Sequence, residues 1–172
     1  MTSSSATPNA VIGQGRQATA AAWELAFGAE PPLGAHLVTP RHGYAHHGIY
    51  VGHGRVVHYA GYCHRYQRGP VEELSLSAFA DGHGIAVLPT PAARYSASAL
   101  VQRARSRLGE DQYRLLTNNC EHFCTWCLYG KGRSEQVRHC LVHPIKGLRL
   151  ATGLLMSYLR TFATPAWRCV ER

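Results

Sequence analysis

One cysteine in this sequence has the surroundings of a catalytic thiol. Cys120 lies in the motif NNCEHF at residues 118–123, where an asparagine precedes a glutamate by three positions and apolar residues follow. The pattern is similar to a capping box, so we expect a helix to begin at Asn118 or Asn119, with Cys120 in its first turn. There the free amides and the positive end of the helix dipole favour a thiolate and can hold an oxyanion.

Two β-rich segments upstream predict a hairpin. They are YAHHGIYV at residues 44–51 and RVVHYA at residues 55–60, and a glycine turn lies between them. If this turn centres on His53, Gly48 faces His58 across the hairpin. The register of the two strands then decides which histidines share a face.

Alternation along the strands places His46 and His58 on one face as diagonal neighbours, with space between their rings at Gly48. His47 is expected on the opposite face. A bulge or a one-residue slip would reverse the choice between His46 and His47. The other histidines, including His36, are expected to be solvated or held by structural contacts.

These residues together predict a thiol acyl-transfer site. Cys120 is the expected nucleophile, with the lowest thiol pKa of the six cysteines. His46 would take the thiol proton and later protonate the leaving group, while His58 orients His46. Because a neutral imidazole stabilises imidazolium less than a carboxylate does, His58 should matter less than the other two. Asn119 and His122 are expected to lie next to the catalytic residues without taking part in the reaction.

The same motifs resemble the lecithin:retinol acyltransferase (LRAT) domain family, a circularly permuted branch of the NlpC-type papain-like superfamily. The resemblance is carried by residues 46–59 and 119–123. It extends to PLGAHLV at residues 32–38 and to the segment 128–137 that follows the catalytic helix. The resemblance therefore covers most of the chain.

The resemblance implies a nucleophile at Cys120, a general base at His46 and a third polar member at His58. It also implies the circularly permuted papain-like fold and acyl donors that are commonly phospholipids. The chain departs from the family at Ala35, where an acidic residue is common, and at His47, where an aromatic residue often follows the catalytic histidine.

Composition indicates a single globular domain. The chain has 172 residues, of which 45% are hydrophobic and 16% charged, enough for a core without disulfides. We expect a partly flexible N-terminal segment at 1–30, a catalytic domain at 31–142 and an apolar, basic helical segment at 143–172. The first 30 residues lack signal-peptide features, and the six cysteines suit a reducing compartment, so a cytoplasmic location is expected.

The remaining patterns predict an α+β fold, an antiparallel sheet packed on helices. A short helix is predicted at 17–27. Strands are expected at 36–39, 70–75, 84–88 and 113–116, in addition to the hairpin, and a helix at 96–108.

Cys124 and Cys127 form a Cys-x-x-Cys that, with Cys63 and His64, invites comparison with a zinc site. The spacing from Cys120 is helical, so we expect these thiols to pack against the sheet as small apolar residues. No metal and no cofactor are expected.

The net charge of +8 favours an anionic partner. The basic residues are scattered without a recognition motif, so no nucleic acid is expected. Residues 145–163 contain an apolar stretch with basic flanks, too short to span a bilayer but suited to an anionic membrane surface, where the protein would be peripheral. Packing of this segment on the domain is an equal alternative.

The sequence thus predicts a cysteine-dependent acyltransferase or hydrolase that forms a thioester and acts on acyl lipids such as phospholipids. A thiol peptidase or amidase is the enzymatic alternative. The second alternative is a noncatalytic lipid- or protein-binding module of the same fold. Oligomeric state does not follow from the sequence.

Overall fold

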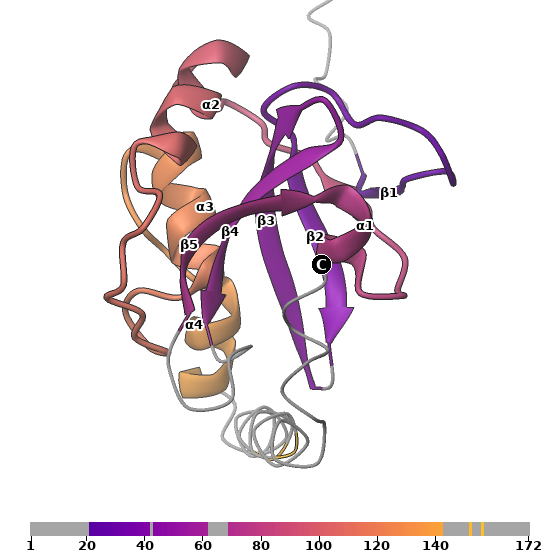
Figure 1. The fold of residues 1–172 in the computed structure, drawn as a ribbon. Coiled ribbons are helices and arrows are strands. Elements are labelled where there is room, and N and C mark those ends of the chain that lie inside the picture. Colours follow the sequence, from indigo (N-terminus) through magenta and orange to yellow (C-terminus); the bar gives the residue numbers. More distant parts are fainter. Residues whose placement is uncertain (1–20, 42, 62–68, 143–151, 153–155, 157–172) are drawn as a thin grey trace, which may run out of the picture.

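An antiparallel sheet of six strands in the order β1-β6-β2-β3-β4-β5 forms the centre of the protein (Figure 1). The computed structural model describes residues 21–41, 43–61, 69–142, 152 and 156. The strands are β1 (Trp23–Glu24), β2 (His36–Arg41), β3 (Tyr44–Gly52), β4 (Arg55–Gly61), β5 (Gly69–Ser75) and β6 (Ala86–Leu88). The helices are α1 (Leu76–Ala80), α2 (Ala97–Arg105), α3 (Cys120–Tyr129) and α4 (Glu135–Val142). The predicted α+β class is confirmed.

Two apolar cores cover the two faces of the sheet. Helices α2 and α3 pack on one face, where Ile49 and Val57 meet Phe123. Helix α1 covers the other face, where Phe79 packs against Tyr50 and other strand residues. Because neighbouring strand residues point to opposite faces, every residue of β3 belongs to one side or the other. Figure 1 shows α1 and the α2–α3 pair on either side of the strands.

From Gly48 to Tyr50 the β3–β4 hairpin has the predicted register, which shifts by one residue only between Tyr50 and Gly52, next to the turn. Gly48 pairs with His58, and the turn contains His53 with a positive φ of 53°. Among the described residues, the β3–β4 pairing stops at Gly48 and His58, while β3 continues along β2 and β4 continues along β5. The two strands therefore separate at the position of the predicted histidines.

Two local predictions are wrong. Residues 113–116 do not form a strand: Arg114 makes an isolated bridge with Asn118, whose amide also donates to the Arg114 carbonyl at 2.8 Å in a tight turn. The described part of the helix predicted at 17–27 contains β1 instead, which pairs with β6. Edge pairing with a distant strand thus overrides the local helical pattern.

Other elements agree with the prediction with small shifts. Strands β2, β5 and β6 fall at the expected places. Helix α2 is capped by Ser96 as predicted but ends at Arg105, and residues after it form turns instead of a further helical turn. Helices α1 and α4 were not predicted.

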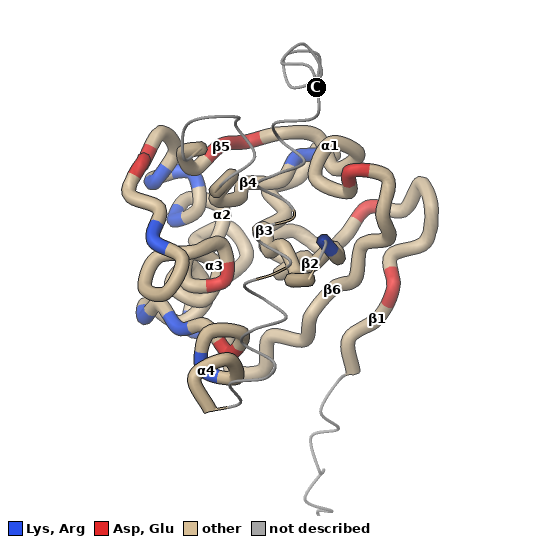
Figure 2. The backbone as a smooth tube through the Cα atoms, turned by 90° about the horizontal axis from the view of Figure 1, so that it is seen from below, with Lys and Arg blue, Asp and Glu red and all other residues tan. Residues whose placement is uncertain are grey.

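The basic residues of the described chain are concentrated in one part. All of its lysines and arginines except Arg41 and Arg55 lie between Arg94 and Arg138, and Figure 2 shows most of them along the side formed by α2, α3 and α4. Most of the segment 145–163 lies outside the described residues, so its role stays a prediction. No helix within the described residues is long and apolar enough to cross a bilayer.

Candidate active site

Helix α3 begins as the sequence predicts, with Asn119 as its N-cap and Cys120 as its first residue. The Asn119 side chain accepts a hydrogen bond of 3.0 Å from the His122 amide, and the His122 side chain faces the Asn119 amide to complete a capping box. Asn119 and His122 therefore fix the start of the helix, and with it the position of the thiol.

The Cys120 thiol is buried at the point where β3 and β4 separate. The Tyr50 amide donates to Ala35 on the β2 side, so the His47 amide, three residues away, points to the β4 side. On that side the amide of His47, together with those of Cys120 and Glu121 in the first turn of α3, lies close enough to the thiol to lower its pKa. The sulfur thus lies against the peptide bond that joins His46 to His47.

Burial sets the protonation state of this thiol. It raises the pKa of Cys120 to about 11, more than the three amides lower it. The prediction of a low pKa is therefore wrong for the resting site, because desolvation depends on tertiary packing. Burial also raises the pKa of Cys127 to about 12, and it raises that of Cys124 well above its usual value.

His46 and His58 make the predicted contact. Nε2 of His46 and Nδ1 of His58 are 2.8 Å apart, and the two rings are nearly perpendicular. Both side chains are buried, and the ring of Phe79 packs against both. Burial, followed by the neighbouring His58 and Arg41, holds the pKa of His46 well below its usual range. His46 is therefore a neutral imidazole at neutral pH, able to accept a proton.

The space predicted at Gly48 is filled by Phe79. A Cβ atom at this position would lie 2.6 Å from Cγ1 of Val56 and 2.8 Å from Cε2 of Phe79. The absence of a side chain at Gly48 thus lets Phe79 pack against the two histidines.

We expect Gly48→Ala to lower the free energy of unfolding by about 1–3 kcal/mol, the usual cost of overpacking. Turnover should fall as well, because Phe79 must move away from the histidine rings. Urea unfolding and steady-state kinetics measure the two effects. Gly84→Ala is the control, since its Cβ would meet only the end of the flexible Glu24 side chain. Equal stability of the two variants would contradict the steric argument.

His47 points to the opposite face, as predicted, and belongs to a second buried network. Its Nδ1 is 2.9 Å from Nε2 of His36, and its Nε2 is 3.0 Å from Nε2 of Gln136. The Ala45 amide donates to Oε1 of Gln136, and Nε2 of Gln136 donates to the Ala45 carbonyl, which fixes the orientation of the amide group. In its contact with His47, Gln136 can therefore act only as the donor.

This orientation determines the tautomers of both histidines. His47 must accept at Nε2, so it carries its proton on Nδ1 and donates to His36. Burial lowers the pKa of His47 to about 4 and that of His36 to about 3. The pair is neutral and joins β2 and β3 to α4, which gives His47 a structural contact on the face opposite His46.

Glu121 has a different role from the predicted one. Its carboxylate does not cap α3; it accepts hydrogen bonds from the amides of Glu135 and Gln136 and from the Ser134 hydroxyl at the start of α4. The capping role falls to His122, one residue later. Sequence reasoning missed this network because its partners lie on another helix, and no local pattern links them.

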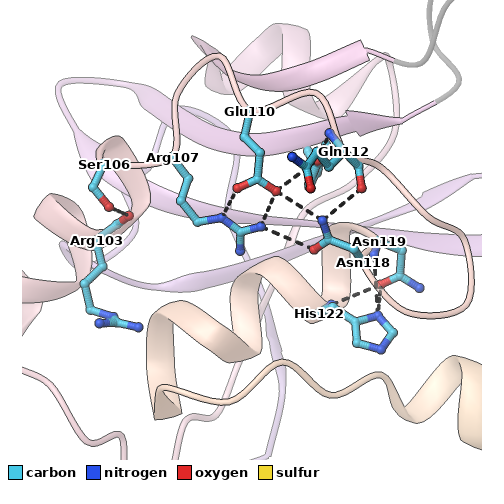
Figure 3. A network of polar contacts seen from close by, with 9 residues as sticks. Arg103, Ser106, Arg107, Glu110, Gln112, Asn118, Asn119 and His122 are labelled. Carbon is cyan, nitrogen blue, oxygen red and sulfur yellow. Dashed lines mark hydrogen bonds and ion pairs between the residues drawn. The ribbon is translucent and has the colours of Figure 1, made fainter.

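The loop that leads into α3 is held by a polar network (Figure 3). Asn118 Nδ2 donates to Oε1 of Glu110 at 3.1 Å and to the Gln112 carbonyl at 3.0 Å. Arg107 forms an ion pair with Glu110 and donates to Oδ1 of Asn118 at 3.3 Å. These contacts fix the residues just before the nucleophile.

Cys124 and Cys127 are fully buried in the core between α3 and the sheet, so the predicted apolar packing is confirmed. Cys63 and His64 lie outside the described residues. Within the part of the chain that the structure describes, no group of three or more histidine, cysteine or acidic side chains is arranged to hold a metal ion.

Comparison with known proteins identifies the family. The family model described as lecithin retinol acyltransferase matches residues 29–133. Phospholipase A and acyltransferase 2 of Homo sapiens is 36% identical over 141 residues, which cover 73% of this chain and 85% of that protein. Phospholipase A and acyltransferase 3 of Homo sapiens is 31% identical over 147 residues, or 76% of this chain and 91% of that protein.

Lecithin retinol acyltransferase of Rattus norvegicus is 32% identical over 85 residues, or 41% of this chain and 36% of that protein. The family model spans more than half of the chain, and it includes the two strands of the histidine pair and the helix of the thiol. The papain-like fold of that family agrees with the observed sheet and helices. The chain therefore belongs to the lecithin retinol acyltransferase family.

Proposed function

We propose that this protein is a cysteine-dependent acyltransferase or hydrolase that acts on phospholipids through a thioester on Cys120. Two contacts support the proposal. The Cys120 thiol lies at the start of α3 against the His46–His47 peptide, and His46 is hydrogen-bonded to His58. A thiol, a neutral imidazole and free helix amides are the components of acyl transfer.

In the first half of the reaction, Nδ1 of His46 takes the thiol proton while the sulfur attacks the ester carbonyl. The resting site is neutral, so charge separation accompanies attack instead of preceding it. The amides of Cys120 and Glu121 in the first turn of α3 would donate to the oxyanion. When the tetrahedral intermediate collapses, His46 gives its proton to the departing alcohol, and an acyl thioester remains on Cys120.

In the second half, His46 activates the acceptor. Water gives a free fatty acid, whereas an amine or an alcohol gives an acylated product, so the same site serves as hydrolase or transferase. The sulfur leaves as thiolate and recovers its proton from His46. This cycle needs no group beyond the chain's own residues and the two substrates.

A lipid donor is favoured by two observations. The relatives that match most of this chain are named phospholipase A and acyltransferase. The net charge is +8, and the described basic residues lie mainly on the side of α2, α3 and α4. A basic protein binds anionic lipid surfaces more strongly, so peripheral contact with a membrane is part of the proposal.

Detection of the acyl-enzyme intermediate tests the proposal. We expect that incubation with a phosphatidylcholine of defined acyl chains, followed by an acid quench and mass spectrometry, reveals an added acyl mass on the peptide that contains residues 118–123. Hydroxylamine should remove this mass, because thioesters are labile to it. The adduct should be missing from Cys120→Ala.

Full activity of the Cys120→Ala variant would contradict the thiol mechanism. An adduct formed from a peptide or amide substrate but not from lipid would identify the peptidase alternative. Lipid binding without turnover of either substrate would identify a noncatalytic module.

A further inference from the structure

His58 has a second neighbour that lies outside the predicted triad. His58 of β4 pairs directly with Glu72 of β5, and residues so paired project from the same face with adjacent side chains. Oε1 of Glu72 lies 3.2 Å from Nε2 of His58. The carboxylate thus stands behind the histidine pair, on the side away from His46.

The Nε2 atom of His58 is buried and makes no hydrogen bond to any described residue. The Glu72 oxygen is within reach of Nε2, but the contact does not have the angle of a hydrogen bond. The His58 side chain is 4% exposed and that of Glu72 is 34% exposed. A buried donor therefore faces a carboxylate that keeps contact with water.

From this geometry we propose that Glu72 is a positioning residue that acts through His58, which extends the site to a chain of Cys120, His46, His58 and Glu72. The inference rests on the proposed thiol mechanism. A carboxylate accepts but cannot donate, so it favours His58 with its proton on Nε2. Nδ1 of His58 is then an acceptor, and His46 must carry its proton on Nε2.

This tautomer is the one that catalysis requires. With Nε2 of His46 donating to His58, Nδ1 of His46 is free of hydrogen and can take the thiol proton. The reverse tautomer places a proton on Nδ1 of His46 and a lone pair of His58 against the carboxylate. Glu72 disfavours that arrangement.

Glu72 also supplies the negative charge that a pair of neutral imidazoles lacks. When the thiol proton moves to His46, the resulting imidazolium is stabilised by a carboxylate one ring away. In this scheme Glu72 takes up no proton, and the proton moves only between the sulfur, His46 and the leaving group. This support matters because burial raises the pKa of the thiol and lowers that of His46, so charge separation is costly.

The test compares Glu72→Gln with Glu73→Gln. Glu73 points to the opposite face, where it pairs with Arg55 and Arg105, so its variant controls for loss of one negative charge on β5. We expect Glu72→Gln to lower kcat by about 10- to 50-fold, in line with loss of a Coulomb attraction across one ring in a partly buried site. KM should be unchanged, Glu72→Asp should recover part of kcat, and Glu73→Gln should keep kcat.

A second readout does not depend on lipid turnover. The rate of alkylation of Cys120 by iodoacetamide reports the thiolate, and Glu72→Gln should move its pH profile upward relative to Glu73→Gln. Failure of the proposed function would leave this shift intact but remove lipid turnover from the unmodified protein. The two ideas are thereby separated.

A double-mutant cycle tests the route through His58. In a His58→Asn background, Glu72→Gln should have no further effect on kcat, because the residue it acts through is gone. An equal loss with and without His58 would overturn the proposal. So would a kcat for Glu72→Gln within twofold of the unmodified protein, or an unshifted alkylation profile.

Discussion

His46→Ala should lower kcat by about 10²–10⁴-fold, the usual cost of losing a general base, whereas His47→Ala should keep most of the turnover per folded molecule. The two residues are adjacent but face opposite sides of the sheet. His46 contacts His58, and the side chain of His47 contacts His36 and Gln136. The influence of His47 on the thiol pKa comes from its backbone amide, which alanine retains.

The His47 variant should instead lose stability. Its removal leaves Nε2 of His36 without the partner it has in the native protein, at a cost of about 1–3 kcal/mol for the unsatisfied group. Gln136 loses one of its acceptors but keeps its hydrogen bonds with Ala45. Turnover must therefore be normalised to the folded fraction, measured by circular dichroism. His58→Asn is a useful third variant, because asparagine can still orient a ring and should retain part of the activity. Equal losses of normalised kcat for His46→Ala and His47→Ala would mean that the base has been assigned to the wrong face.

The hairpin and the start of α3 were predictable because the signals are local. A glycine turn and strict alternation determine which of His46 and His47 shares a face with His58. The pair of asparagines before Cys120 narrows the start of the helix to two positions. In both cases a few residues that are neighbours in the sequence determine the local structure.

Contacts between distant elements were not predictable in the same way. Glu72 lies beside His58 only because of the register of β4 and β5, and residues 62–68 between those strands contain no turn motif that fixes it. Glu121 accepts a hydrogen bond from Ser134, the residue just before α4, and no spacing in the sequence indicates this contact. The raised pKa of Cys120 was not predictable for the same reason, since the burial that raises it depends on packing between distant elements.

The buried histidines make the fold sensitive to acid. Burial lowers the pKa of His36 to about 3 and of His47 to about 4, and it also lowers that of His46. Below pH 6.5 the unfolded chain binds protons at these residues but the folded protein does not. The free energy of unfolding therefore decreases as the pH is lowered. A proton on Nε2 of His47 would face the N–H donor of Gln136, so this contact also disfavours protonation of His47 in the folded protein.

Between pH 7 and pH 5 we expect His36 and His47 each to lower the free energy of unfolding by about 2 kcal/mol. Urea unfolding at the two pH values measures the loss. His36→Gln keeps an acceptor for His47 but does not titrate, so it should reduce the acid loss by about 2 kcal/mol. His83→Asn removes an exposed histidine and should leave the loss unchanged. An identical pH dependence in His36→Gln and the unmodified protein would show that His36 is protonated equally in the folded and unfolded states, and the neutral His36–His47 pair would then be wrong.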